Sequence, residues 1–339
     1  MRHISLLACA FALFVAAGPA GAGARPSAPS WATPQIKAVV DAGLMAPSVA
    51  EFRPDDPLTA GELSAVLASL GFVSAPAEPD RPVTLRELNA QLVTAAGLRP
   101  QAREIRLQAT YAGLSPKSWL GTETIARMLG LRLNHLMAHD ERELQLAQHA
   151  TRAEAAYSLA RLLSLEQREV DAAVSATSTL VFPVLEPLQQ AVLRRALRFV
   201  GSPYVWAGTS ERRQRLGART LPGGFDCSGL VWRVYKLEPF AEAPGLQDVL
   251  AGRTTYAMSG EVSRSARIAR ADLQPGDLVF FGARGPRSKP TEVGHMGIYL
   301  GAGWMVHSSD RGTTLVPMNG WYETRFAWGR RPLAEAGLA

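Results

Sequence analysis

The pattern of apolar residues changes near residue 180, and this change constrains the fold more than any other feature. Before it, apolar residues recur at helical spacing behind Thr-x-x-Glu sequences at 59–62, 84–87 and 151–154, which are typical of helix starts. After it, helical runs are followed by two strand-like runs, 294–300 and 304–309. We therefore predict an α-helical N-terminal region followed by an α+β domain.

The composition agrees with two folded units of ordinary globular type. The chain has 339 residues, of which 47% are hydrophobic and 19% charged, so disorder and a disulfide-stapled miniprotein are excluded. The net charge of +6 is a small excess spread along the chain. Nucleic-acid binding is therefore not expected, although a basic protein suits an anionic cell-wall polymer.

Residues 1–24 have the pattern of a secretory signal peptide. Arg2 and His3 precede an apolar run over 4–17, and small residues follow in Ala20-Gly21-Ala22 and Ala22-Gly23-Ala24. No later segment has transmembrane length. We expect an exported protein that is secreted or located in the cell wall or periplasm, with no membrane span.

The region 25–170 contains repeated helix signals. Besides the Thr-x-x-Glu starts, Ala-Gly-Leu recurs at 42–44, 96–98 and 112–114, where glycine can end a helix in a left-handed conformation. Residues 31–163 resemble S-layer homology repeats, which implies attachment to wall polysaccharide. A helical scaffold without a ligand is the alternative interpretation. Residues 171–185 are predicted to be a linker to the second domain, 186–339.

Histidines in this region do not indicate a metal site. His135 and His139 stand four apart on a predicted helix, and His149 follows, but no cysteine or HExxH pattern accompanies them. We predict solvent-facing histidines and no metal ligand.

Cys227 is the only thiol left once the signal peptide, with Cys9, is removed. Such a thiol is buried and inert, paired between chains, or kept for its reactivity. Asp226 is placed to cap a helix that begins at Cys227, and a helix start favours the thiolate. Since the Asp226 charge opposes ionisation, a histidine base must supply the rest.

Two candidates for that base lie in the strand-like runs, His295 in the first and His307 in the second. If residues 301–303 form the turn of a hairpin, the two histidines lie on one face of the sheet as near diagonal neighbours. A two-residue turn would place them on opposite faces unless a bulge intervened. On one face, His295 can accept the thiol proton while His307 orients its ring.

Together these motifs resemble the NlpC/P60 family of papain-like cysteine peptidases over about residues 186–333. The motifs that carry the resemblance, in family order, are Tyr204-Val205-Trp206, Asp226-Cys227-Ser228-Gly229, Leu273-Gln274-Pro275-Gly276-Asp277-Leu278, Gly294-His295-Met296-Gly297 and Val306-His307. The resemblance implies a cysteine helix packed on an antiparallel sheet. It also implies hydrolysis of peptidoglycan stem peptides, usually between D-glutamate and the diamino acid that follows.

The resemblance also implies roles for individual residues. Cys227 is the nucleophile, His295 the general base and His307 the residue that orients it. Tyr204 borders the cleft and helps hold the oxyanion, and Asp226 and Ser228 hold a substrate amino terminus. No metal or organic cofactor is expected.

Two other functions stay open, a non-catalytic wall-binding or structural protein and an amidase or acyltransferase on the same fold. The segment 210–224 is longer than expected and contains Arg212, Arg213, Arg215 and Arg219. It is either a solvated loop or a rim of the cleft that pairs with stem-peptide carboxylates.

Overall fold

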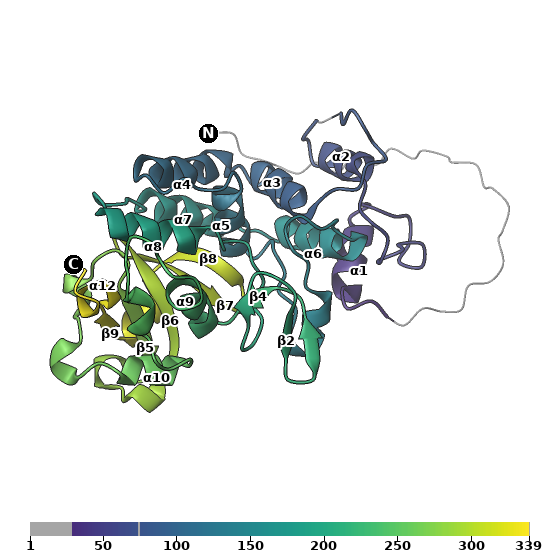
Figure 1. Cartoon of the computed structure of the whole chain (residues 1–339). Coiled ribbons are helices and arrows are strands. Elements are labelled where there is room, and N and C mark those ends of the chain that lie inside the picture. Colours follow the sequence, from purple (N-terminus) through teal and green to yellow (C-terminus); the bar gives the residue numbers. More distant parts are fainter. Residues whose placement is uncertain (1–28, 74, 339) are drawn as a thin grey trace.

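The computed structural model describes residues 29–73 and 75–338, so the predicted signal peptide lies outside the described residues. Helices dominate the first half of the chain (Figure 1). They are α1 (Thr33–Asp41), α2 (Ala60–Ser69), α3 (Leu85–Ala95), α4 (Arg99–Tyr111), α5 (Leu120–Met128), the 3₁₀ helix η1 (Met137–Arg142), α6 (Arg152–Leu163) and α7 (Gln167–Ser178). No helix in the described part of the chain combines the length and apolarity needed to cross a membrane.

Three extended segments form a closed ring at the starts of α2, α3 and α6. The backbone N–H of Leu58 donates to Ala150, that of Ala150 to Val83 and that of Val83 to Leu58, each at 2.8 Å. Each segment then enters its helix through a threonine N-cap. The capping boxes predicted at Thr59 and Thr84 are confirmed, because in both the glutamate three residues on bonds back to the threonine N–H.

The third predicted capping box, at Thr151, is only half formed. The Thr151 hydroxyl accepts the Glu154 N–H, but the Glu154 carboxylate does not return to the N-cap backbone. Its Oε1 instead lies 2.9 Å from Nε2 of His135. A buried tertiary partner has thus replaced the local one.

This pairing makes the prediction of a solvent-facing His135 wrong. The side chain is buried, and its ring packs edge-on against Trp31 with ring centroids 4.6 Å apart. It precedes η1, so it does not share a helix with His139. His139 and His149 are exposed, as predicted. The described residues contain no cluster of His, Cys, Asp and Glu suited to a metal ion.

The Ala-Gly-Leu sequences end helices as expected. Gly43, Gly97 and Gly113 have φ angles of 73°, 75° and 75° at the ends of α1, α3 and α4. At the first of these, the N–H of Leu44 donates to Val39, which satisfies a carbonyl that the helix end leaves open.

The second half of the chain combines helices with a five-stranded antiparallel sheet. The helices are α8 (Pro187–Leu197), α9 (Cys227–Tyr235), α10 (Thr255–Gly260), α11 (Trp321–Arg325) and α12 (Pro332–Glu335). The strands are β5 (Leu278–Gly282), β6 (Val293–Gly301), β7 (Trp304–Ser309), β8 (Gly312–Pro317) and β9 (Phe326–Arg330), in the order β8-β7-β6-β5-β9. The predicted α+β arrangement is present.

The two faces of this sheet have different roles. Met296, Ile298 and Val306 point toward α9 and join the main core with Val231 and Val234. Residues of the opposite parity form a separate cluster on the other face. His295 and His307 belong to that second face. The helix that carries the cysteine therefore covers one face while both imidazoles lie on the other.

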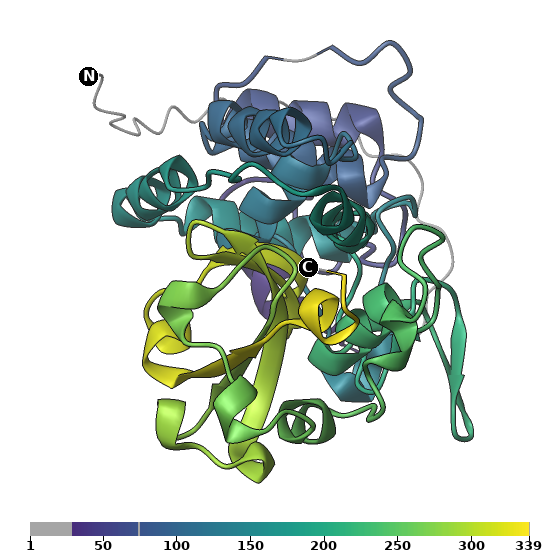
Figure 2. The same cartoon turned by 60° about the vertical axis from the view of Figure 1, so that its left-hand side comes forward.

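The helical region and the sheet pack against each other directly (Figures 1 and 2). Arg127, at the end of α5, is fully buried and donates to the carbonyls of Gly201, Ser202 and Arg311. Helix α7 runs into the segment 171–185 that was predicted to be a linker. Residues of α5 and α7 line the cavity that His295 and His307 also line.

The segment 210–224 forms a hairpin that projects from the molecule (Figure 2). The hairpin consists of β2 (Gln214–Leu216) and β3 (Arg219–Leu221), and β1 (Thr209–Ser210) pairs with β4 (Gly224–Phe225) at its base. Its four arginines are exposed, and Arg219 donates to the carbonyl of Met137.

Candidate active site

Cys227 is the first residue of α9, as predicted. The side chain of Asp226 caps the helix, its Oδ1 accepting the N–H of Gly229 at 2.5 Å. A Cβ on Gly229 would lie 1.8 Å from the Gly208 carbonyl oxygen, so only glycine fits at this position of the first helical turn. The cap and the close approach together hold Cys227 in place. Its side chain is partly exposed.

The environment of Cys227 favours the neutral thiol. Burial raises its pKa, and the Asp226 charge adds to this. The Thr255 hydroxyl, 3.5 Å from Sγ, and the backbone N–H groups of Met296 and Ser228 act in the other direction without reversing it. The expectation that the helix start would favour the thiolate is therefore outweighed, and proton transfer to a base is required.

The hydrogen bond that the Cys227 sulfur accepts from the backbone N–H of Met296 places it beside strand β6. Met296 directly follows His295 in the chain. Gly301 pairs with Trp304, so Ala302 and Gly303 form a two-residue turn. The register shifts between Tyr299 and Gly301, which leaves Tyr299 opposite Met305 and Ile298 opposite Val306. The expected three-residue turn is therefore not formed, and the bulge that the two-residue alternative requires places His295 and His307 on one face.

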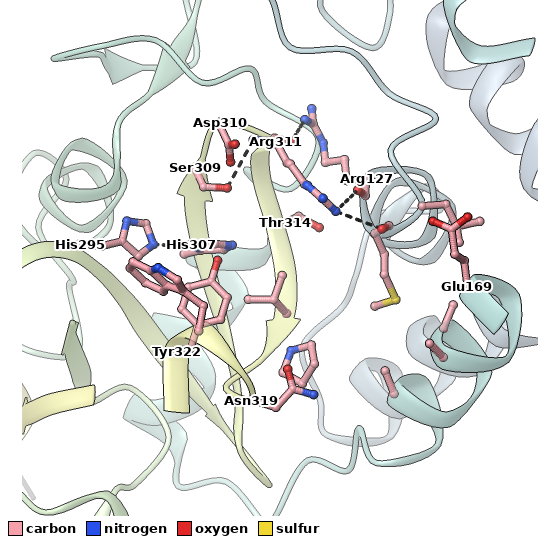
Figure 3. Close-up of a pocket in the computed structure, with 18 residues that line it drawn as sticks. Arg127, Glu169, His295, His307, Ser309, Asp310, Arg311, Thr314, Asn319 and Tyr322 are labelled. Carbon is pink, nitrogen blue, oxygen red and sulfur yellow. Dashed lines mark hydrogen bonds between the residues drawn. The ribbon is translucent and has the colours of Figure 1, made fainter. Parts of the chain in front are cut away.

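The two imidazoles are hydrogen-bonded to each other. Nε2 of His295 lies 2.8 Å from Nδ1 of His307 (Figure 3). For Nδ1 of His295 to accept a proton, Nε2 must carry its hydrogen, so we assign His307 Nδ1 as the acceptor of this bond. His307 is buried, whereas His295 is partly exposed. The inner ring thus orients the outer one.

Both histidines are neutral at physiological pH. Burial lowers the pKa of His295 to about 4, opposed by the charge of Asp310. Burial also lowers the pKa of His307 well below its usual value, and His295 and Arg311 lower it further. A neutral His295 is free to take a proton, and Trp321 packs near its ring with centroids 6.2 Å apart.

Tyr204 lies close enough to Cys227 for the two to interact electrostatically. Burial raises the pKa of its hydroxyl, and the negative charges of the Cys227 thiolate, when it forms, and of Asp226 raise it further, so the hydroxyl remains a hydrogen-bond donor. Its backbone forms a bridge with Phe225, the residue that leads into the α9 cap. Trp206, next in the same motif, is largely exposed.

Arg253 completes the polar side of the site, and sequence analysis assigned it no role. Its guanidinium donates to Ser228 Oγ at 2.7 Å, to Asp226 Oδ1 at 3.3 Å and to the Ala207 carbonyl at 3.1 Å. Ser228 in turn donates to Asp226 Oδ1. Among the described residues, the hydrogen bonds to this carboxylate all end on Oδ1.

Comparison with known proteins identifies this part of the chain. Residues 201–331 match the family model described as NlpC/P60 family. The chain therefore contains an NlpC/P60 domain, which begins and ends inside the predicted range 186–333.

Several curated proteins resemble the same region. A probable endopeptidase of Mycobacterium tuberculosis is 36% identical over 131 residues, covering 38% of this chain and 26% of the relative. The gamma-D-glutamyl-L-lysine dipeptidyl-peptidase of Bacillus cereus is 32% identical over 152 residues, covering 43% and 37%. The murein DD-endopeptidase MepH of Escherichia coli is 32% identical over 123 residues, covering 36% and 37%.

The chain thus spans only 26% to 37% of the length of these three relatives. Among solved structures, an NlpC/P60 family protein from Bacillus cereus matches with a TM-score of 0.33 and 26% identity, over 46% of this chain and 43% of that chain.

Proposed function

We propose that this protein is a cysteine endopeptidase that hydrolyses peptide bonds in peptidoglycan stem peptides. Two observations carry the proposal: the Cys227 sulfur at the start of α9 accepts the backbone N–H of Met296, the residue that follows His295 in the chain, and the His295 ring is hydrogen-bonded to His307. The endopeptidase names of the relatives support the substrate class.

The proposed reaction begins with a neutral thiol and a neutral imidazole. His295 Nδ1 takes the Cys227 proton as the sulfur attacks the scissile carbonyl carbon. The resulting oxyanion accepts hydrogen bonds from the Cys227 backbone N–H and the Tyr204 hydroxyl. His295 then protonates the leaving amine, and a thioester remains. Water attacks the thioester with His295 as base, which releases the carboxylic acid and restores the thiol.

We further propose that the scissile bond joins D-glutamate to the diamino acid, as the Bacillus cereus relative's name suggests for that enzyme. In this proposal Asp226 Oδ2 receives the substrate's amino terminus, because the protein's own bonds end on Oδ1. Ser228 and Arg253 hold the Asp226 carboxylate in position to receive this amino terminus.

The test is digestion of purified sacculi by the protein and by its Cys227→Ala variant, followed by mass measurement of the released fragments. His139→Ala, an exposed histidine in η1, is the matched control. Release of fragments by the parent and by His139→Ala, with none from Cys227→Ala, supports the proposal. No release by the parent would favour a non-catalytic wall protein, and products that retain the stem would favour an amidase or acyltransferase.

We also propose export to the cell wall or periplasm, with wall polysaccharide bound by the helical region. The pattern of residues 1–24 supports export, and the resemblance of residues 31–163 to S-layer homology repeats supports wall binding. Co-sedimentation of the Cys227→Ala protein with sacculi, before and after chemical removal of the attached polysaccharide, tests it. Equal binding to both preparations would reject the polysaccharide as the ligand.

A further inference from the structure

A cavity of about 880 Å³ opens directly from the paired histidines (Figure 3). One wall is the histidine face of the sheet, where His307, Thr314 and Val316 lie side by side. The other wall belongs to the helical region and combines small and apolar side chains, such as Ala172 and Ala176 of α7, with the charged side chains of Arg127 and Glu169. We call this cavity the α7 groove. Its size is within the range of sites that bind small ligands, about 300–1,000 Å³.

Several features indicate that the α7 groove receives a ligand. It is continuous with His295, which is partly exposed beside it. The hydroxyl of Thr314, a residue that lines it, is buried and has no hydrogen-bond partner among the described residues. Asp310 and Arg311 are exposed at its edge and offer one charge of each sign. A polar ligand with both charges would complement this edge.

The chemistry of the proposed reaction determines which part of a substrate enters. His295 must donate a proton to the leaving nitrogen, so the leaving portion lies on the imidazole side of the sulfur. The Cys227 backbone N–H and Asp226, which is proposed to hold the substrate's amino terminus, are at the start of α9, so the acyl portion lies there. The α7 groove begins at the imidazoles, and neither Cys227 nor Tyr204 lines it.

We propose that the α7 groove binds the leaving portion of the stem peptide, a diamino acid residue with the residues attached to it. This inference rests on the proposed function and adds a specificity site built by the helical region. The carboxylate of the leaving portion pairs with Arg311, and the free side-chain amine pairs with Asp310. The small side chains of α7 leave room for the extended backbone.

The first experiment fills the groove. Ala172→Trp adds a large side chain at an exposed position of α7 that lines it, while Val174→Trp adds the same group on the same helix outside the lining. Each protein is assayed on L-Ala-γ-D-Glu-diaminopimelyl-D-Ala and on L-Ala-γ-D-Glu 4-nitroanilide, which has only a small leaving group. Melting temperature and the rate of Cys227 alkylation verify that each variant is folded.

We expect Ala172→Trp to lower kcat/KM for the tetrapeptide about tenfold or more and to leave the anilide within about twofold, since only the longer leaving portion enters the groove. Val174→Trp should change neither value. Equal losses on both substrates, or no loss on the tetrapeptide, would overturn the groove proposal. Failure of the parent protein to cleave either substrate would instead reject the proposed function.

The second experiment tests the charge at the edge. Asp310→Asn should lower cleavage of a tetrapeptide with a free side-chain amine relative to one whose amine is acetylated. The measured quantity is the rate for the free-amine tetrapeptide divided by the rate for the acetylated one. Any effect of Asp310 on His295 cancels in this ratio, because both substrates use the same base. An unchanged ratio would remove Asp310 from the proposed site.

Discussion

Asn134, in the helical region, forms hydrogen bonds with both backbone polar groups of Tyr204 in the NlpC/P60 domain. Its Oδ1 accepts the Tyr204 N–H at 2.7 Å, and its Nδ2 donates to the Tyr204 carbonyl at 3.5 Å. The residue proposed to hold the oxyanion is therefore positioned from outside the family domain. The helical region thus takes part in building the active site, besides any role in binding the wall.

The first prediction concerns the hydrogen bonds between Asn134 and Tyr204. Asn134→Ala removes both bonds, which together contribute about 1–3 kcal/mol, so kcat for stem peptides should fall about tenfold. Alkylation of Cys227 by iodoacetamide should change little, because the sulfur keeps its own partners. Asn134→Asp keeps the stronger, accepting contact and should retain more activity. A parallel fall in kcat and alkylation rate would indicate general disorder of the site instead.

The second prediction is the pH dependence of cleavage. His295 acts as a base only when neutral, and its pKa is lowered to about 4. We expect kcat/KM to remain nearly level from pH 8 to about pH 5 and to fall as His295 becomes protonated near pH 4. A profile that falls near pH 6.5, the ordinary value for histidine, would contradict the burial of this ring.

The lowered pKa of His295 also makes the free energy of unfolding depend on pH. Between about pH 6.5 and 4, unfolded histidine binds a proton that the folded His295 does not, so the free energy of unfolding should decrease as pH falls through this range. His295→Gln should weaken this dependence. Denaturant unfolding at several pH values measures it, and identical slopes for the two proteins would contradict the prediction.

The third prediction concerns Arg253. Arg253→Ala leaves the Asp226 charge without its guanidinium partner, 3.3 Å away, and that charge already raises the pKa of Cys227. Alkylation at pH 7 should slow about threefold or more, and added salt should reduce the difference. Arg253→Lys keeps the charge but loses the fork that also holds Ser228. It should restore alkylation more fully than peptide cleavage.

The parts of this site that were predictable share a local origin. The alignment of His295 with His307 was left open between two turn lengths and depends on the bulge after Tyr299. The cap at Asp226, in contrast, follows from residues a few positions apart. Helix starts at Thr59 and Thr84 were predictable for the same reason.

The residues that sequence analysis missed act over long separations. Asn134 and Tyr204 are 70 positions apart, and Arg127 and Arg311 are 184 apart. No local spacing indicates such contacts. His135 shows the same limit, since its burial depends on Glu154 and Trp31, both distant in sequence. The sign of the Cys227 pKa shift likewise depends on tertiary burial, which outweighs the effect of the helix start.

The fourth prediction concerns the buried pair that joins the helical region to the sheet. Arg127 and Glu123 are both fully buried, with Nε and Oε2 3.7 Å apart, and Arg127 also donates to the Gly201 carbonyl at 2.8 Å. Arg127→Met leaves Glu123 without its cation and should lower the free energy of unfolding by roughly 3–5 kcal/mol. Arg127→Met with Glu123→Gln should recover part of that loss.

The pH dependence of these two variants separates the charge from the lost packing. Burial raises the pKa of Glu123, and removal of Arg127 eliminates a charge that opposes the rise. Folded Glu123 therefore holds a proton at pH values where the unfolded side chain has lost it, so acidification stabilises the single variant. Relative to the double variant, its melting temperature should rise as pH falls from 7 to 5. A constant difference between the two would mean that Glu123 is not an unpaired buried charge and that the carbonyl contacts of Arg127 account for the loss.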